Sequence, residues 1–221
     1  MRTLYLTLLA LLASAASAQQ CSFVLVSSQT NSSGDTRTDS ITYSFDGPNV
    51  AMLMHGRGNQ PDVRLVFDPA AGAITQLHTI NGMKGGFVFA MSEKRWPGMT
   101  YSQDTPTGGK VKYTGKEKVI QGHTCKEMKV SGSEYSGTAW VAEDIPLSML
   151  RVFSYQSVGA GKSTTEADNL KAMGMNGLPL EMTLKSTTGK ADVQLLVLDY
   201  QPTVDASLFN TEGHSTTFVE E

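Results

Sequence analysis

Histidine and cysteine offer the greatest capacity for catalysis or metal binding in this sequence, and both are scarce. The chain has four histidines and two cysteines, Cys21 and Cys125. None of the histidines has the HxxxH or HExxH spacing of zinc sites, and the cysteines are too far apart in sequence to form a metal-binding pair motif. His123 and Cys125 share one face of an expected strand, where such neighbours usually pack rather than act as base and nucleophile. From these histidines and cysteines we predict that the protein is not an enzyme and binds no metal and no cofactor.

Two other patterns have a possible chemical meaning. Gly159–Ser163 ends in Gly-Lys-Ser like a phosphate-binding loop, but it lacks the first glycine of that motif and follows an expected helix, which favours a surface turn. Methionine is frequent, with eleven residues, and Met52 and Met54 share a strand face beside His55. Thioether groups can capture Cu(I), can line an adaptable apolar cavity, or can simply fill a core.

The composition limits the classes of partner. The 221 residues include 18 Lys and Arg against 21 Asp and Glu, and the net charge of −3 argues against a nucleic-acid-binding face. A hydrophobic content of 40% suffices for a buried core, while 21 glycines and 18% charged residues favour strands and turns over helices.

The N-terminal residues have the pattern of a signal peptide. Arg2 precedes an apolar run, Leu4–Leu12, and Ala16-Ser17-Ala18 matches the A-x-A recognised by signal peptidase. We expect residues 1–18 to be removed by cleavage after Ala18, leaving one domain, residues 19–221, exported to the periplasm or outside the cell. Lipidation at Cys21 is disfavoured by the preceding Gln20. No later segment is long and apolar enough to be a transmembrane helix.

The two cysteines leave two alternatives open. In an oxidising compartment Cys21 and Cys125 could form a disulfide that ties down the N-terminal strand and contributes about 4 kcal/mol. Two unpaired thiols, one of them buried on a strand, are the other alternative.

The mature sequence is a succession of apolar or alternating runs separated by turn residues. The expected strands are Ser22–Ser28, Ile41–Phe45, Val50–Met54, Val63–Phe67, Ile74–Ile80, Phe87–Met91, Val111–Ile120, Thr124–Val130, Thr138–Val141, Leu178–Leu184 and Val193–Leu198. Residues 92–109 are expected to form a long loop. Helices are expected at Pro146–Tyr155, with Asp144 as a possible cap, and at Thr165–Met175.

These elements predict a mainly β fold, a single curved antiparallel sheet of about eleven strands with a short helical lid. A sheet must cover its apolar face, and two short helices cannot cover eleven strands. Either the sheet curls on itself, or part of its apolar face lines a cavity.

The order of the strands resembles the periplasmic lipoprotein-carrier (LolA-like) superfamily, and most closely a secreted branch of it that is a domain of unknown function. The most specific stretch, Thr114–Val130, is similar to that branch's T-G-x-x-K-x-I-x-G-x-x-C-x-x-Y/M-x-V. Trp140–Ile145, Gly177–Met182 and the closing Ala206–Phe209 extend the similarity. The resemblance implies a half-barrel whose concave face takes up acyl chains beneath the lid. Carriers of this kind hold the lid with an arginine on a sheet strand, and here Arg57 and Arg64 lie on or near early strands outside any matching motif.

Two functions fit the sequence. The first is a non-enzymatic binding protein for a lipid or other apolar ligand, held on the concave face by Phe45, Met52, Met54, Phe67, Phe87, Phe89, Trp140 and Met182. The second is a structural or protein-interaction domain of the cell envelope, with a filled core and no small ligand. If the lid residues all point inward and fill the concave face, the first hypothesis fails; these residues are Leu147, Leu150, Phe153, Leu170 and Met173.

Overall fold

The computed structural model describes residues 19–105, 112–159, 161–175 and 177–220. The predicted signal peptide, residues 1–18 with its cleavage site after Ala18, lies outside the described residues. Parts of the other predictions do too: residues 106–109 of the long loop, Val111 at the start of a strand, Ala160 in the glycine-rich turn and Asn176.

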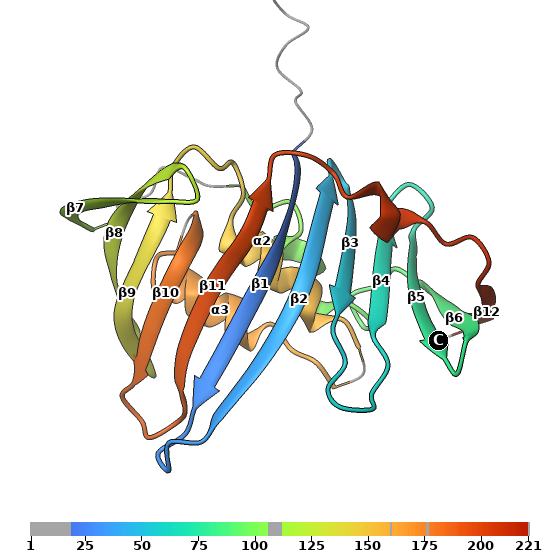
Figure 1. Cartoon of the computed structure of the whole chain (residues 1–221), viewed down its shortest axis with the longest axis horizontal. Coiled ribbons are helices and arrows are strands. Elements are labelled where there is room, and N and C mark those ends of the chain that lie inside the picture. The colour runs from blue at the N-terminus through green and yellow to red at the C-terminus, as the bar shows by residue number, and fades with distance from the viewer. Residues whose placement is uncertain (1–18, 106–111, 160, 176, 221) are drawn as a thin grey trace, which may run out of the picture.

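Twelve strands form one open, curved sheet in the order β12-β6-β5-β4-β3-β2-β1-β11-β10-β9-β8-β7 (Figure 1). Their bounds are β1 Gln20–Thr30, β2 Thr36–Asp46, β3 Asn49–Met54, β4 Val63–Asp68, β5 Ala73–Ile80, β6 Met83–Ala90, β7 Tyr113–Ile120, β8 His123–Ser131, β9 Tyr135–Ala142, β10 Leu178–Ser186, β11 Asp192–Gln201 and β12 Ser215–Val219. The predicted mainly β fold with a curved sheet and two short helices is confirmed.

The twelfth strand, β12, is absent from the sequence-based prediction. It pairs with β6 in parallel, whereas the other described pairs of strands are antiparallel. Its one large apolar side chain, Phe218, is 59% exposed. Because backbone pairing rather than burial holds this strand, its sequence lacks the alternation that identifies a half-buried strand.

The helices lie against one face of the sheet, which we call the concave face (Figure 1). They are α2 (Met149–Ser154), the 3₁₀ turn η2 (Tyr155–Ser157) and α3 (Thr165–Ala172). The prediction that α2 begins at Pro146 with Asp144 as its cap is wrong. Ser148 is extended, and its side chain accepts a hydrogen bond from the Arg151 amide, so Ser148 is the cap. The predicted helix at Thr165–Met175 is shorter than expected, because its last residue is Ala172.

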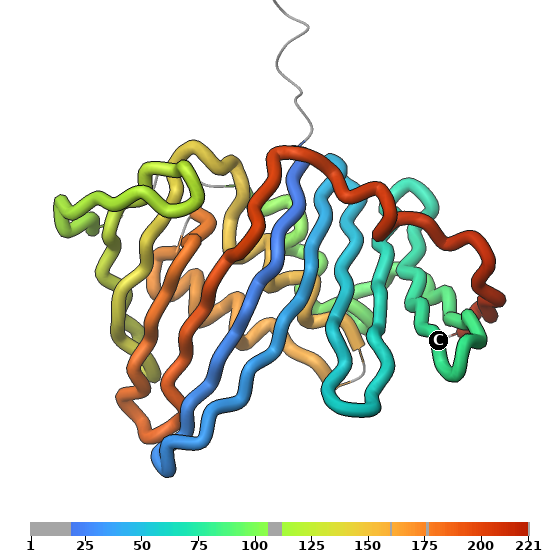
Figure 2. Tube along the Cα trace, in the orientation of Figure 1, coloured from blue at the N-terminus to red at the C-terminus, as the bar shows by residue number. Residues whose placement is uncertain are grey.

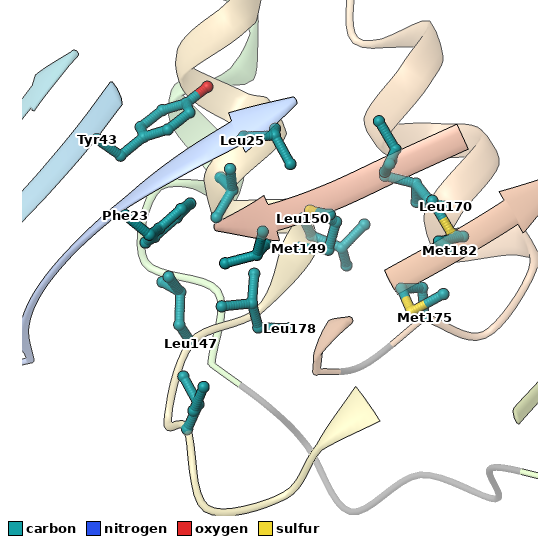
Figure 3. Packing of buried hydrophobic residues seen from close by; sticks show 14 of the residues in the cluster. Phe23, Leu25, Tyr43, Leu147, Met149, Leu150, Leu170, Met175, Leu178 and Met182 are labelled. Carbon is teal, nitrogen blue, oxygen red and sulfur yellow. The ribbon is translucent and has the colours of Figure 1, made fainter. Parts of the chain in front are cut away.

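The core lies between these helices and the concave face. Figure 3 shows side chains of β1, β2 and β10 pointing toward those around α2, with Phe23 and Leu178 on the sheet side and Leu147, Met149 and Leu150 opposite them. All five residues are at most 4% exposed. The rings of Phe23 and Tyr43 add a stacked pair at 5.4 Å between centroids. The helical layer therefore fills the middle of the concave face.

Part of the predicted long loop 92–109 packs into this core as a plug. It contains the 3₁₀ turn η1 (Pro97–Tyr101), and the preceding Trp96 is 2% exposed. The Trp96 indole donates a hydrogen bond of 2.7 Å to the Ser154 carbonyl, and its ring lies 5.0 Å from that of Phe67. Gly98 allows the close approach, because a Cβ there would lie 2.5 Å from the Ser154 carbonyl oxygen. The Pro and Gly residues that rule out a strand thus permit a tight contact with α2.

The lid carries its own arginine. The Arg151 side chain is buried on α2 and donates hydrogen bonds of 2.6 Å to the Gln19 side chain and to the Gly47 carbonyl. Its guanidinium lies over the Phe45 ring, 5.2 Å from the centroid. Charge-assisted bonds of this kind are among the stronger ones in proteins. Arg151 therefore ties the helical layer to the start of β1 and to the β2–β3 turn.

The arginines expected from the resemblance lie elsewhere. Arg64 holds the C-terminal segment on the other, convex face by donating to the carbonyls of Ser207 and Asn210, at 2.9 and 2.6 Å. That segment includes the 3₁₀ turn η3 (Ala206–Phe209) and crosses β3 and β4 before reaching β12 (Figure 2). Arg57 pairs with Asp39. Neither Arg64 nor Arg57 has a hydrogen bond to the helical layer among the contacts of the described residues.

Both cysteines are buried free thiols in the structure. Cys21 lies on β1 and Cys125 on β8, with three strands between them. Neighbouring strands are about 4.8 Å apart, whereas a disulfide needs Cα atoms within about 7 Å. Burial raises the pKa of the Cys21 thiol to about 12, which keeps it protonated at neutral pH. The geometry favours the alternative with two unpaired thiols.

Replacement of the plug residue is expected to destabilise the whole fold. Trp96→Ala leaves a cavity beside Phe67 and Tyr155 and should lower the free energy of unfolding by about 3–5 kcal/mol. Urea denaturation followed by circular dichroism measures this. Val119→Ala, at a side chain that is 70% exposed, is the matched control and should change stability little. A Trp96→Ala variant as stable as the control would contradict the assignment of Trp96 to the core.

The thiols have a distinct signature in a titration with Ellman's reagent. Protein purified without reductant should show no reactive thiol while folded, because both are buried, and two after unfolding in guanidinium. A count of zero in both states would establish a disulfide and contradict the structure at β1 and β8.

Candidate functional site

A cavity of about 560 Å³ remains between the sheet and the helical layer, at the end of β1 and the start of β2. Its size lies within the range of small-molecule sites. The residues around it come from β1, β2 and β3, from η1, α2, η2 and α3, and from the segments after β3 and between α2 and α3. They are Leu25, Ser27, Gln29, Arg37, Asp39, Ser40, Ile41, Met52, Met54, His55, Gly98, Phe153, Ser154, Gln156, Ser157, Gly161, Lys162, Ser163, Thr164, Glu166 and Ala167. We call it the lid pocket.

The floor of the lid pocket is apolar. Leu25, Ile41 and Met54 lie in one row across three strands, because Leu25 pairs with Ile41 and Ile41 pairs with Met54. Met52, two residues before Met54 on the same face of β3, is 1% exposed. Phe153 contributes from α2 and is half-buried. Adjacent strands in register thus bring side chains from separate runs of the sequence to one apolar surface.

Beyond this row the same face becomes polar. The inward positions of β1 change from Leu25 to Ser27, and those of β2 change from Ile41 to Asp39. Ser27 pairs directly with Asp39, so the change occurs at the same level on both strands. Two residues further along, at the next inward position, Gln29 pairs with Arg37. The lid pocket therefore has an apolar floor and a polar rim.

Charged side chains of both signs surround the rim. Asp39 accepts from Arg37 Nε at 3.3 Å and also pairs with Arg57 from the β3–β4 loop. His55 contacts Thr42 Oγ1 at 3.0 Å and lies 3.6 Å from Asp62. Lys162 and Glu166 line the pocket from the α2–α3 side.

The serines of the inner wall are satisfied within the helical layer. Ser154 Oγ donates to the Arg151 carbonyl at 2.7 Å, and Ser157 Oγ donates to the Ser154 carbonyl at 2.6 Å. Ser157 Oγ also accepts from the Gly98 amide at 2.8 Å. These bonds fix the wall without requiring a polar partner from a ligand.

The predicted ligand-binding residues have four different locations. Met52 and Met54 line the lid pocket. Three others are fully buried core residues, namely Phe45, Phe67 and Met182. Phe87 and Phe89 share the inward face of β6 toward one end of the sheet, where Phe87 is 40% exposed and the Arg95 guanidinium lies 4.2 Å above the Phe89 ring.

Trp140 lies on the opposite face, which corrects the prediction that it is part of the concave surface. It stands between Ala139 and Val141 on β9, whose side chains are buried in the core, so its own side chain points to the convex side. The Lys118 ammonium lies 4.4 Å above its ring and pairs with Glu181. The Lys118 ammonium covers the Trp140 ring on the convex side, so this side chain does not have to pack in the core. A prediction made from hydrophobicity alone therefore assigns Trp140 to the wrong face.

The residues predicted to bind the ligand include only two that line the lid pocket, Met52 and Met54. Ile41 and Phe153 belong to expected elements but not to that set, and Arg37 and Asp39 precede the predicted start of their strand. The alternation of β2 continues through five inward positions, Arg37, Asp39, Ile41, Tyr43 and Phe45. Extending it across the charged residues would have revealed the polar rim.

The His–Cys pair has an arrangement unlike that of a nucleophile and its base. His123 Nδ1 bonds Asp144 Oδ2 at 2.7 Å, while the Cys125 thiol points to the His123 carbonyl at 3.6 Å. Burial also raises the pKa of the Cys125 thiol. Within the described residues, no three His, Cys, Asp or Glu side chains gather where they could hold one metal ion. Met52 and Met54 serve as pocket floor.

A second cavity, of about 500 Å³, lies beneath the C-terminal segment on the convex face and includes Arg64, Lys84 and Glu212 in its lining. Its main cation, Arg64, is already bonded to the carbonyls of Ser207 and Asn210. This cavity therefore belongs to the packing of that segment.

None of the helices that the structure describes has the length and apolar character needed to span a membrane. Among solved structures, the chain is similar to PNGF-II, with 14% identity and a TM-score of 0.41 over 91% of this chain, although it spans only 32% of that chain. An uncharacterized conserved protein from Thermus thermophilus has 8% identity and a TM-score of 0.42, with 91% of both chains covered. A LolA superfamily protein from Nitrosomonas europaea has 6% identity and a TM-score of 0.37, with 89% of this chain and 92% of that chain covered.

The comparison with curated proteins finds no match. The comparison with protein families does, over residues 31–211, and the matching family is described as Domain of unknown function (DUF4412). This match covers most of the chain and confirms the family resemblance expected from the sequence: the chain belongs to the DUF4412 family.

Proposed function

We propose that this chain is an exported, non-enzymatic binding protein that holds one small lipid or other apolar ligand in the lid pocket. The observation that carries the proposal is the apolar row of Leu25, Ile41 and Met54, which lines a cavity of about 560 Å³ and in which Ile41 and Met54 are only half-buried. The ligand site is thus one end of the concave face rather than the whole of it.

The lid side chains favour a small ligand. Leu147, Leu150, Leu170 and Met173 are buried in the core and fill the central part of the concave face. Phe153, in contrast, is only half-buried and lines the lid pocket. The filled centre leaves no room for a large acylated protein segment, whereas a single chain fits the remaining space.

Burial of the ligand supplies the affinity. Each methylene moved from water to the apolar floor contributes about 0.8 kcal/mol, which is roughly a fourfold change in the dissociation constant. A modest pocket therefore suffices for binding without any special chemistry.

Export is part of the proposal and rests on the sequence. Arg2, the apolar run Leu4–Leu12 and the A-x-A ending at Ala18 support cleavage by a signal peptidase. We place the mature protein, residues 19–221, in the periplasm or outside the cell.

A protein-interaction role is the second candidate, supported by the open edge of the sheet. β12 is an edge strand, and all but one of its five residues are exposed, including Phe218. Unpaired backbone groups of such an edge can accept a strand from an envelope protein partner. This role does not require the lid pocket, so ligand binding distinguishes the two candidates.

Filling the pocket is expected to weaken binding. Met54 is half-buried at the mouth of the floor, so Met54→Trp places a larger side chain where the ligand would lie. Titration with the uncharged fluorescent probe N-phenyl-1-naphthylamine should give a dissociation constant at least tenfold weaker than that of the wild type.

The matched control is Met83→Trp, at an exposed methionine on β6 outside the pocket. It should bind the probe as the wild type does, and circular dichroism should show both variants folded. No probe binding by the wild type, or equal binding by Met54→Trp, would reject the proposal and favour the interaction role.

A further inference from the structure

We infer that the ligand of the lid pocket is a single-chain amphiphile with an anionic headgroup, a carboxylate or a phosphate, held at the rim by Arg37 and Lys162. This inference rests on the proposed function and names the chemical class of its ligand. Three features of the pocket support it, which are the position of the polar rim, the donors left open there and the prior engagement of the carboxylates.

The polarity of the pocket changes in one direction. Leu25 and Ile41 form the floor, and Ser27 with Asp39 and then Gln29 with Arg37 follow at successive register positions. The polarity therefore changes along the strands rather than across them. A ligand that lies along the strands, with its chain on the floor and its head at the rim, meets an environment matched to each end.

The rim has unused hydrogen-bonding capacity. Asp39 already accepts from two arginines, Arg37 and Arg57. Arg37 contributes only its Nε to that pair and retains the donors of its two terminal nitrogens. Lys162 has no ion-pair partner within the described part of the chain. The rim thus has open donors on cations, and an anion with several acceptor oxygens complements them.

The carboxylates around the opening are already engaged. Among the residues that line the pocket, two positive charges, on Arg37 and Lys162, balance two negative charges, on Asp39 and Glu166. Asp39 is shared between Arg37 and Arg57, and Arg57 lies outside the lining. Glu166 lies exposed in the first turn of α3, where the positive end of the helix dipole favours it. The groups that remain open to a headgroup are therefore the cations Arg37 and Lys162, which favour an anionic head.

The Gly-Lys-Ser sequence of the α2–α3 connection lines the lid pocket, where we assign it to headgroup binding and not to nucleotide binding. Gly161 has a φ of +72°, which glycine adopts readily, and Lys162 and Ser163 line the pocket beside it. Lys162 lines the pocket from this connection, and Arg37 lines it from β2. A headgroup bound by both cations would thus join the helical layer to the sheet.

The test is displacement of N-phenyl-1-naphthylamine by four twelve-carbon compounds, each below its critical micelle concentration or, for dodecanol, below its solubility limit. Dodecanoate and dodecyl phosphate carry the two anionic heads, dodecanol is uncharged, and dodecyltrimethylammonium is cationic. We expect at least one anion to bind five- to tenfold more tightly than dodecanol, and the ammonium compound to bind most weakly. The comparison of dodecanoate with dodecyl phosphate identifies the preferred head.

The variant for this test is the double substitution Arg37→Gln and Lys162→Gln. It should reduce the affinity for the preferred anion to that of dodecanol and leave dodecanol unchanged. Lys84→Gln, which removes a cation from the convex face, is the matched control and should change neither affinity.

The outcomes separate this inference from the function on which it rests. Equal binding of dodecanol and both anions by the wild type, or an anion preference that survives the double substitution, overturns the anionic headgroup and leaves the apolar binding function standing. Failure of all four compounds and of the probe to bind overturns the binding function itself.

Discussion

Two short helices cover the inward face of a twelve-stranded sheet, and this mismatch in area governs the rest of the structure. Exposure of an apolar face to water is unfavourable, so the segments near this face pack against it. Trp96 enters from a connection in which Pro97 and Gly98 follow it, the residues around α2 fill the centre, and Arg151 fastens that layer to Gln19 and Gly47. The lid pocket is the part of the apolar face that this cover leaves free.

The chemical character of the pocket follows from strand register. Because β1, β2 and β3 are in register, one apolar side chain from each strand falls in the same row, and the polar positions of β1 and β2 beyond that row also coincide. The same alternation that builds the core thus continues beyond the helical layer and produces a charged rim. A ligand with an apolar chain and an anionic head satisfies both parts, whereas a purely apolar ligand leaves the open donors of Arg37 and Lys162 to water.

The sequence predicts the sheet well because inward and outward residues alternate with a period of two in almost every strand. It predicts the site less well, since a cavity depends on which inward residues are covered. Phe45 and Met182 carry the same signal as Met54, yet the first two are fully buried in the core and Met54 is half-buried at the pocket. Hydrophobicity assigns Trp140 to the wrong face because this residue packs beneath Lys118. The strand β12 is not predicted because backbone pairing holds it and Phe218 is exposed, so its sequence lacks the pattern of a half-buried strand.

The most direct test of the central claim compares native and denaturing mass spectra of the mature chain, exported to the periplasm and purified without detergent. We predict a native mass that exceeds the denatured mass by that of one single-chain amphiphile, or an unliganded protein that gains one such molecule when it is added. An unliganded mass in both states, unchanged by added amphiphile, would contradict the claim.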